Sequence, residues 1–254
     1  MLPFSPIIFY GNKIEPYRVL YEMKQTVATQ SLTYAIQEDV KIVNVCIVGH
    51  GGAAGGGLSY RNNISVQVGD VFTINFSATG ANSVYKNGSE LICVANSGQV
   101  WSGGNSIAYG GNGGKNANPI NDGGGNGGTA TQGGSRNSIK VLGGAGGYSG
   151  SGGAGDLGST QKNWYGAPDP NSGAGAGGVR RFSSSGGQAL GGNVGLRGKT
   201  NTPNGSPSAT ADITYNGENG SVSVGIMCGG GVNSTTSNFN AGVVIQTGND
   251  STYP

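Results

Sequence analysis

Apolar and polar positions alternate with a period of two along several stretches of the chain, which is the spacing of β-strands. The run VKIVNVCIV at residues 40–48 is almost continuously apolar and β-branched, which predicts a buried strand. Residues 64–68 and 71–76 alternate on either side of Gly69-Asp70, and they predict two strands that this turn joins into a hairpin. The first hundred residues are therefore expected to be rich in strands.

A β-hairpin is predicted where Asn87-Gly88 separates two further apolar runs, because Asn-Gly is the strongest short-range hairpin signal. Its two strands are residues 83–86 and 91–94. Two late strands are predicted at residues 222–227 and 243–247. These strands bracket the middle of the chain, so they are expected to tie its two ends together.

The N-terminal region has a different pattern. Residues 7–10, Ile-Ile-Phe-Tyr, predict a short strand. Residues 16–38 predict one helix that begins at Pro16, because apolar side chains recur there at about helical spacing. These side chains are Val19, Leu20, Met23 and Val27. The fold class expected from the whole pattern is mainly β, with a small N-terminal region that holds this helix.

Composition changes this picture in the middle of the chain. Glycine supplies 53 of the 254 residues, and only Gly11 lies within the first 48. The other glycines gather in short blocks, which alternate with polar loops between residues 102 and 205. Five of these blocks are residues 110–114, 123–128, 143–147, 152–155 and 173–178.

Such blocks fit polyglycine-II helices packed side by side into a bundle, or sandwich, within one chain. This geometry has three residues per turn and no internal hydrogen bonds, so its backbone groups must bond between helices, and close approach excludes side chains. The alternative is a set of solvated low-complexity loops. A flexible linker, however, would not be interrupted by Trp164, Tyr165, Phe182 and paired arginines.

Charge and cysteine content exclude several classes of function. The net charge is +2, which indicates neither a nucleic-acid-binding protein nor a membrane-surface protein. Cys46, Cys93 and Cys228 lie far apart in apolar runs without a C-x-x-C spacing, so we expect buried thiols and no metal site. The first residues lack the pattern of a signal peptide, so export by a standard route is not expected.

One motif suggests a cofactor. Gly49-x-Gly51-x-x-Ala54 follows a predicted strand, as in the dinucleotide-binding fingerprint, and Asp70 lies 21 residues after Gly49. The fingerprint needs a helix to begin there, and the three glycines at 55–57 disfavour a helix because of their low helix propensity. His50 is the only histidine, and no triad or carboxylate pair can be assigned. We therefore expect no cofactor and no enzymatic activity.

Aromatic and basic residues in the loops are stronger candidates, because binding sites favour Trp, Tyr and Arg. The longest loop between dense glycine blocks carries Asn163-Trp164-Tyr165, and the next carries Arg180-Arg181-Phe182. The alternative is that these rings cap the bundle. The candidate binding residues are Asn163, Trp164, Tyr165, Arg180, Arg181, Phe182 and Arg136.

Residues 102–205, with glycine blocks separated by variable loops, resemble the receptor-recognising adhesin at the tip of the long tail fibre in T-even-type bacteriophages. In addition, VKIVNVCIVGHGGAAGGG, followed by ISVQVGDVFTINF and LICVAN, is similar to the glycine-rich domain of phage tail proteins, in which the Gly-Asp turn forms a hairpin. Residues 1–48 depart from the adhesins, whose attachment region is rich in tryptophan, because they contain none.

The resemblance implies a tail-fibre-tip adhesin of the virion, made in the cytoplasm of the bacterial host. Residues 1–48 would dock onto the tail fibre protein, and residues 49–101 would form a β-rich shoulder. Residues 102–205 would present loops to a host outer-membrane protein or lipopolysaccharide, and residues 206–254 would return as strands. The alternative is a polyglycine-II antifreeze-type surface-binding protein, which would need flat faces with few loops.

Overall fold

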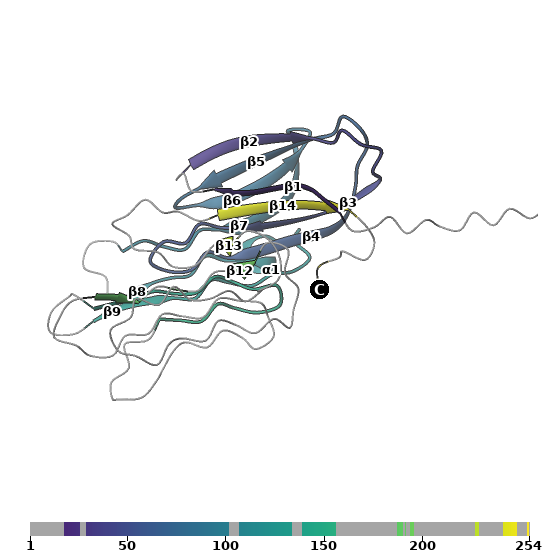
Figure 1. The fold of residues 1–254 in the computed structure, drawn as a ribbon. Coiled ribbons are helices and arrows are strands. Elements are labelled where there is room, and N and C mark those ends of the chain that lie inside the picture. Colours follow the sequence, from purple (N-terminus) through teal and green to yellow (C-terminus); the bar gives the residue numbers. More distant parts are fainter. Residues whose placement is uncertain are drawn as a thin grey trace, which may run out of the picture.

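A computed structural model describes residues 18–25, 29–101, 107–133, 139–155, 187–189, 191, 194–195, 227–228, 241–247 and 253. Within these residues the fold is mainly β and has three layers (Figure 1): two antiparallel sheets lie face to face, and a glycine-rich layer packs beneath the second of them.

The outer sheet has the strand order β2-β5-β6-β7, with every pair antiparallel. Its strands are β2 (Thr29–Ala35), β5 (Val71–Ser77), β6 (Ala81–Lys86) and β7 (Glu90–Asn96). Buried residues alternate with partly exposed residues along β5, as expected for a strand with one face on the core. The predicted hairpin is confirmed, and both Asn87 and Gly88 have the positive φ that a type I′ turn requires.

The middle sheet has the order β1-β14-β3-β4, again antiparallel throughout. Its strands are β1 (Arg18–Gln25), β3 (Ile42–Val48), β4 (Leu58–Ser65) and β14 (Ala241–Thr247). All seven residues of β14 are buried, because both faces of this sheet are covered. The strands predicted at 40–48 and 243–247 are confirmed. Because β14 lies between β1 and β3, the late part of the chain is joined to the early part.

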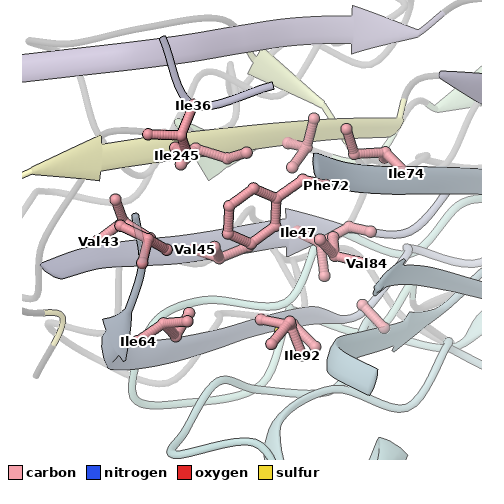
Figure 2. Close-up of a cluster of buried hydrophobic side chains, with 14 of the residues drawn as sticks. Ile36, Val43, Val45, Ile47, Ile64, Phe72, Ile74, Val84, Ile92 and Ile245 are labelled. Carbon is pink, nitrogen blue, oxygen red and sulfur yellow. The ribbon is translucent and has the colours of Figure 1, made fainter. Parts of the chain in front are cut away.

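The main hydrophobic core fills the space between the two sheets. Figure 2 shows Phe72 of β5 at its centre, with Val45 and Ile47 of β3 and Val84 of β6 around it. A second cluster lies on the other face of the middle sheet, where Val48, Leu58, Tyr60 and Val244 meet the glycine-rich layer. The members that face them from beyond the sheet include Ala145, Tyr148 and Tyr253.

The glycine-rich layer contains α1 (Gly114–Ala117) and several very short strands. These are β8 (Ile107–Ala108), β9 (Ala130–Gly133), β10 (Ile139–Val141), β11 (Gly187–Ala189), β12 (Val194–Gly195) and β13 (Met227–Cys228). The strands β11-β10-β9-β8 form one sheet, and β12 pairs with β13. Of the strand predicted at 222–227, only Met227 falls within the described residues, and it begins β13.

Extended glycine segments hydrogen-bond to one another across this layer. Gly55 donates to Gly128 O at 3.0 Å and accepts from Gly111 N at 2.9 Å. The next glycine, Gly56, accepts from Gly146 N at 2.9 Å. Successive residues of one segment thus bond to different neighbouring segments, whereas the backbone groups of a strand reach only two neighbours in one plane.

The close approach of these segments depends on the missing side chains. A Cβ added to Gly55 would lie 1.8 Å from Gly144 O, and one on Gly127 would lie 1.9 Å from Gly55 O. One on Gly146 would lie 2.0 Å from Gly125 O. The obstacle is backbone in each case, so it cannot move aside as the end of a side chain would.

The predicted helix at 16–38 is wrong, because the described residues of this segment form strands β1 and β2 and the start of the loop that follows β2. Tyr21 and Met23 alternate toward the main core, whereas Val19 packs on the opposite face. The register shifts between Val19 and Tyr21, so Leu20 is an extra residue in β1. Because of this extra residue, the apolar side chains of strand β1 recur at a spacing close to that of a helix. The strand predicted at residues 7–10 lies outside the described residues.

The predicted hairpin around Gly69-Asp70 is also wrong, because β4 and β5 belong to different sheets. Residues 66–70 cross from the middle sheet to the outer sheet. The turn itself is present: Gly69 has φ +92°, and Asp70 N donates to Gln67 O at 3.1 Å. Local pattern identified the turn, but the pairing partners of the two strands lie elsewhere in the sequence.

Candidate functional site

Two segments, 134–138 and 156–186, carry the candidate residues. The described residues that flank these segments lie at one side of the molecule, where β8, β9, β10 and β11 lie next to one another. Ile107 of β8 pairs with Thr131, and Gly133 of β9 pairs with Ile139. Ile139 also pairs with Gly187 of β11. Figure 1 shows β8 and β9 at the left end of the layer. We call this region the β8–β11 end.

Two large apolar side chains are exposed at this end. Tyr109 has 60% of its surface exposed and Ile107 has 44%. The backbone around them is well fixed, since Gln99 N donates to Tyr109 O at 3.0 Å and the Gln99 side-chain Oε1 accepts from Tyr109 N at 3.1 Å. An exposed aromatic ring on a rigid backbone loses little conformational freedom on binding, which favours recognition.

Trp101 lies at the same end. Its side chain is partly buried against a small cluster of alanines and Leu142. The indole Nε1 is buried and has no hydrogen-bond partner among the described residues. Because this N–H is buried, a molecule bound at the surface does not reach it, and Trp101 contributes to the packing of this end.

The predicted binding residues lie outside the described residues: Asn163, Trp164, Tyr165, Arg180, Arg181, Phe182 and Arg136. The described residues that flank them do show where their loops join the layer. Arg136 belongs to the loop between Gly133 and Ile139, which are paired to each other at the β8–β11 end.

The other six residues belong to segment 156–186, which joins described residues at Gly155 and Gly187. Gly155 N donates to Thr129 O at 2.7 Å, and Gly155 O accepts from Thr131 Oγ1 at 2.8 Å. Gly187 pairs with Ile139. Both junctions therefore lie beside β9 and β10, which places the ends of this segment at the β8–β11 end, near Ile107 and Tyr109.

Sequence reasoning did not identify Trp101, Ile107 and Tyr109 as candidates. The sequence does contain a signal for this region: in WSGGNSIAY, Trp101 and Tyr109 stand at the two ends of a short, mostly polar stretch. That signal gives no indication of exposure, which depends on the pairing of β8 with β9.

The Gly49–Ala54 motif does not offer a cofactor site. Residues 49–57 are buried, contain no helix, and pack against other glycine segments. A Cβ on Gly49 would lie 2.2 Å from Asn96 O, so another backbone fills the space that a pyrophosphate would need. His50 is fully buried, with its ring 6.1 Å from that of Phe76, and burial lowers the pKa of His50 to about 4.

Two further groups with reactive chemistry, the thiols of Cys46 and Cys93, lie among the described side chains. Cys46 and Cys93 are buried, and burial raises the pKa of the Cys93 thiol well above its usual value. The described part of the chain has no cluster of three or more His, Cys, Asp or Glu side chains that could hold a metal ion. Its helix α1 has four residues, and no described helix could serve as a membrane span.

No protein-family model matches the chain, and no curated protein is similar enough to count as a match.

Proposed function

We propose that this chain is a receptor-binding adhesin at the tip of a bacteriophage tail fibre, and that its glycine segments are short polyglycine-II helices. The helices act as a scaffold almost free of side chains. Their loops then vary in sequence without disturbing a packed core, which suits a protein whose role is recognition. In this proposal the chain is not an enzyme, uses no cofactor and binds no nucleic acid.

The hydrogen bonding of Gly55, Gly56 and Gly57 supports the polyglycine-II assignment. These consecutive residues bond respectively to segments near Gly128 and Gly111, to Gly146, and to Asn96. With three residues per turn, the backbone groups of consecutive residues point in three directions around the axis, so one helix bonds to several neighbours. The backbone oxygens that a Cβ would meet support the same packing.

The observation that carries the adhesin proposal concerns the two segments that hold the predicted binding residues, 134–138 and 156–186. The described residues that flank both segments lie at one end of the scaffold, next to the exposed Tyr109 and Ile107. Large rings beside basic residues are typical of binding surfaces, because they bury much area with few rotatable bonds. The receptor in this proposal is an outer-membrane protein or lipopolysaccharide of the host.

Attachment to the virion is assigned to residues 1–48, which dock onto the tail fibre protein. Strands β1, β2 and β3 are integral parts of the two sheets, so residues 18–48 also hold the fold together. In this proposal the contacts with the fibre leave the strand pairings of β1, β2 and β3 intact, because these pairings hold the two sheets together. The division of the chain into four regions stays a prediction.

The experiment is a pull-down of the purified, full-length protein on intact bacteria. Binding to one host strain, its loss after the lipopolysaccharide or one outer-membrane protein is removed, and no binding to unrelated bacteria would support the proposal. Failure to bind any of a broad panel of strains, with the protein folded, would overturn it.

A further inference from the structure

The two sheets have four edges in total, and two of them are covered by the glycine-rich layer. At the edge of β4, Leu58 N donates to Gly125 O and Tyr60 N donates to Gly123 O, both at 3.0 Å. At the edge of β7, the side chain of Asn121 accepts from Val94 N at 3.1 Å and donates to Val94 O at 2.8 Å. These edges are not available to another strand.

The edges formed by β1 and β2 differ. Among the described strands, β1 pairs only with β14 and β2 pairs only with β5, so each has one side that faces no strand. Figure 1 shows β2 at the outer edge of its sheet. Leu32 and Tyr34 of β2 face the core but are only partly buried, and the Tyr34 ring stacks on Tyr21 of β1 at 5.0 Å.

The direction in which the backbone groups of β2 point can be derived from Ile36, the first residue after the strand. Ile36 N donates to Asp70 O at 2.8 Å, on the side of β5. Backbone groups alternate in direction along an antiparallel strand, so the even-numbered residues of β2 bond to β5 and the odd-numbered residues direct N–H and C=O outward. The outward residues are Thr29, Ser31, Thr33 and Ala35.

Nothing in β2 protects this edge. Edge strands usually carry charges, proline or a bulge, which prevent pairing with another chain. The sequence TQSLTYA has no charged residue and no proline, and its register with β5 is continuous over all seven residues. By contrast, β1 carries Arg18, Glu22 and Lys24 and has a register shift.

We propose that β2 pairs with β2 of a second copy of this chain, in antiparallel orientation about a two-fold axis at Leu32. This register aligns all seven residues and sets Ser31 opposite Thr33 of the partner, so outward backbone groups meet. Gln30 lies opposite the partner's Tyr34, and Leu32 lies opposite the partner's Leu32. An uncharged strand paired with itself brings no like charges together, and the pairing covers the partly buried Leu32 and Tyr34.

Sedimentation of the full-length protein over a range of concentrations tests this pairing without reference to the adhesin proposal. The native protein is expected to be a dimer. Thr33→Pro removes an outward N–H and no bond to β5, so it should give a folded monomer. Should that variant fail to fold, Ser31→Lys with Thr33→Lys sets lysine opposite lysine and should also give a monomer.

Charge exchange tests the register. Ser31→Lys combined with Thr33→Glu sets lysine opposite glutamate and should restore the dimer, because residue 31 lies opposite residue 33. Thr73→Lys is the matched control: Thr73 pairs with Thr33 one strand further into the same sheet, so this lysine should leave the dimer intact. A native protein that is monomeric at all concentrations, or a dimer that survives both Thr33→Pro and the double lysine variant, would overturn the proposal.

Cross-linking gives a second measurement. Leu32 forms a non-hydrogen-bonded pair with its counterpart, for which Cα atoms are about 4.5 Å apart, within the range a disulfide spans. Leu32→Cys should therefore form a covalent dimer on oxidation, whereas Gln30→Cys, which lies opposite residue 34, should not. Equal cross-linking of the two variants would exclude this register.

Discussion

The side-chain amide of Asn62 pairs with the backbone of Tyr253 through two hydrogen bonds. Asn62 Nδ2 donates to Tyr253 O at 3.0 Å, and Asn62 Oδ1 accepts from Tyr253 N at 3.0 Å. The pair joins residues 191 positions apart. It holds the Tyr253 ring between Tyr60, with ring centroids 5.2 Å apart, and Tyr148, at 5.5 Å. The amide thus fixes an aromatic stack between the middle sheet and the glycine-rich layer.

Asn62→Asp should weaken this contact between layers. A carboxylate cannot donate to Tyr253 O, and it adds a negative charge near Asp122, which accepts from Asn62 N at 2.7 Å. We expect the free energy of unfolding to fall by about 1–3 kcal/mol, measured by chemical denaturation. Asn63→Asp is the control, since the Asn63 side chain is exposed. Equal stability of the two variants would show that the stack does not depend on the amide.

Gly146→Ala should be strongly destabilising, because the added Cβ would lie 2.0 Å from Gly125 O. To relieve this overlap two backbone segments must separate, which breaks hydrogen bonds such as Gly146 N to Gly56 O. We expect a loss of about 3 kcal/mol or more, measured by thermal or chemical denaturation. In Gly80→Ala the nearest atom is the movable Ser77 Oγ at 3.1 Å, so that variant should change stability by less than about 1 kcal/mol. An unchanged melting temperature for Gly146→Ala would contradict the packing of the glycine layer.

Asp70 should make stability depend on pH in the acid range. Its carboxylate accepts from Asn87 Nδ2 at 2.8 Å and from Gln67 N at 3.0 Å, and these bonds hold the pKa of Asp70 below its usual value. A lowered folded-state pKa gives a stabilisation that is complete above the unfolded-state value of about 3.9 and is lost as pH falls through the folded-state value.

The test is Asp70→Asn, which should lower stability at pH 7 by about 1.5–3 kcal/mol and flatten the decline of stability below about pH 4. Asp39→Asn is the matched control: the Asp39 side chain is 78% exposed and pairs only at the surface with Lys41, so little change is expected. An acid-unfolding profile of Asp70→Asn that parallels the native profile would assign the acid sensitivity to other groups.

Much of the sandwich could be predicted because its signals are local. The apolar run that became β3 needs both faces buried, and Asn87-Gly88 selects its own turn type wherever it occurs. The strands β1 and β2 could not be predicted in the same way. The apolar spacing in β1 is disturbed at Leu20, and the stability of β1 comes from β14, more than 200 residues later in the chain. Tertiary pairing overrode the local pattern.

The binding surface was less predictable than the sheets. Composition identified aromatic and basic loops, because unusual residues stand out against glycine. It could not show that Tyr109 would be 60% exposed while Tyr148 is fully buried, although both follow glycine-rich segments. Glycine blocks have no side-chain pattern from which the neighbour of each segment could be predicted. The order in which the segments pack, and therefore the position of each loop, cannot be predicted from the local sequence.

Tyr109→Ala should reduce adsorption to host cells while leaving the melting temperature nearly unchanged, because most of the side chain is exposed. Loss of an aromatic residue at the centre of an interface typically costs at least about 2 kcal/mol, or about 30-fold in affinity. Val68→Ala is the control: Val68 is 56% exposed but lies in the turn between β4 and β5, away from the glycine layer. Equal adsorption by both variants would place the receptor contact elsewhere.

The loops joined to the β8–β11 end give the last prediction. Trp164→Ala should reduce affinity by at least about 30-fold, mainly through faster dissociation, if the receptor is a protein loop. If the receptor is anionic, as phosphorylated lipopolysaccharide is, Arg180→Glu with Arg181→Glu should slow association and flatten its dependence on salt, because the long-range attraction is removed. Adsorption kinetics at two salt concentrations distinguish the two cases. Native adsorption by both variants, with folding intact, would mean that these side chains cap the glycine layer and that the receptor binds without them.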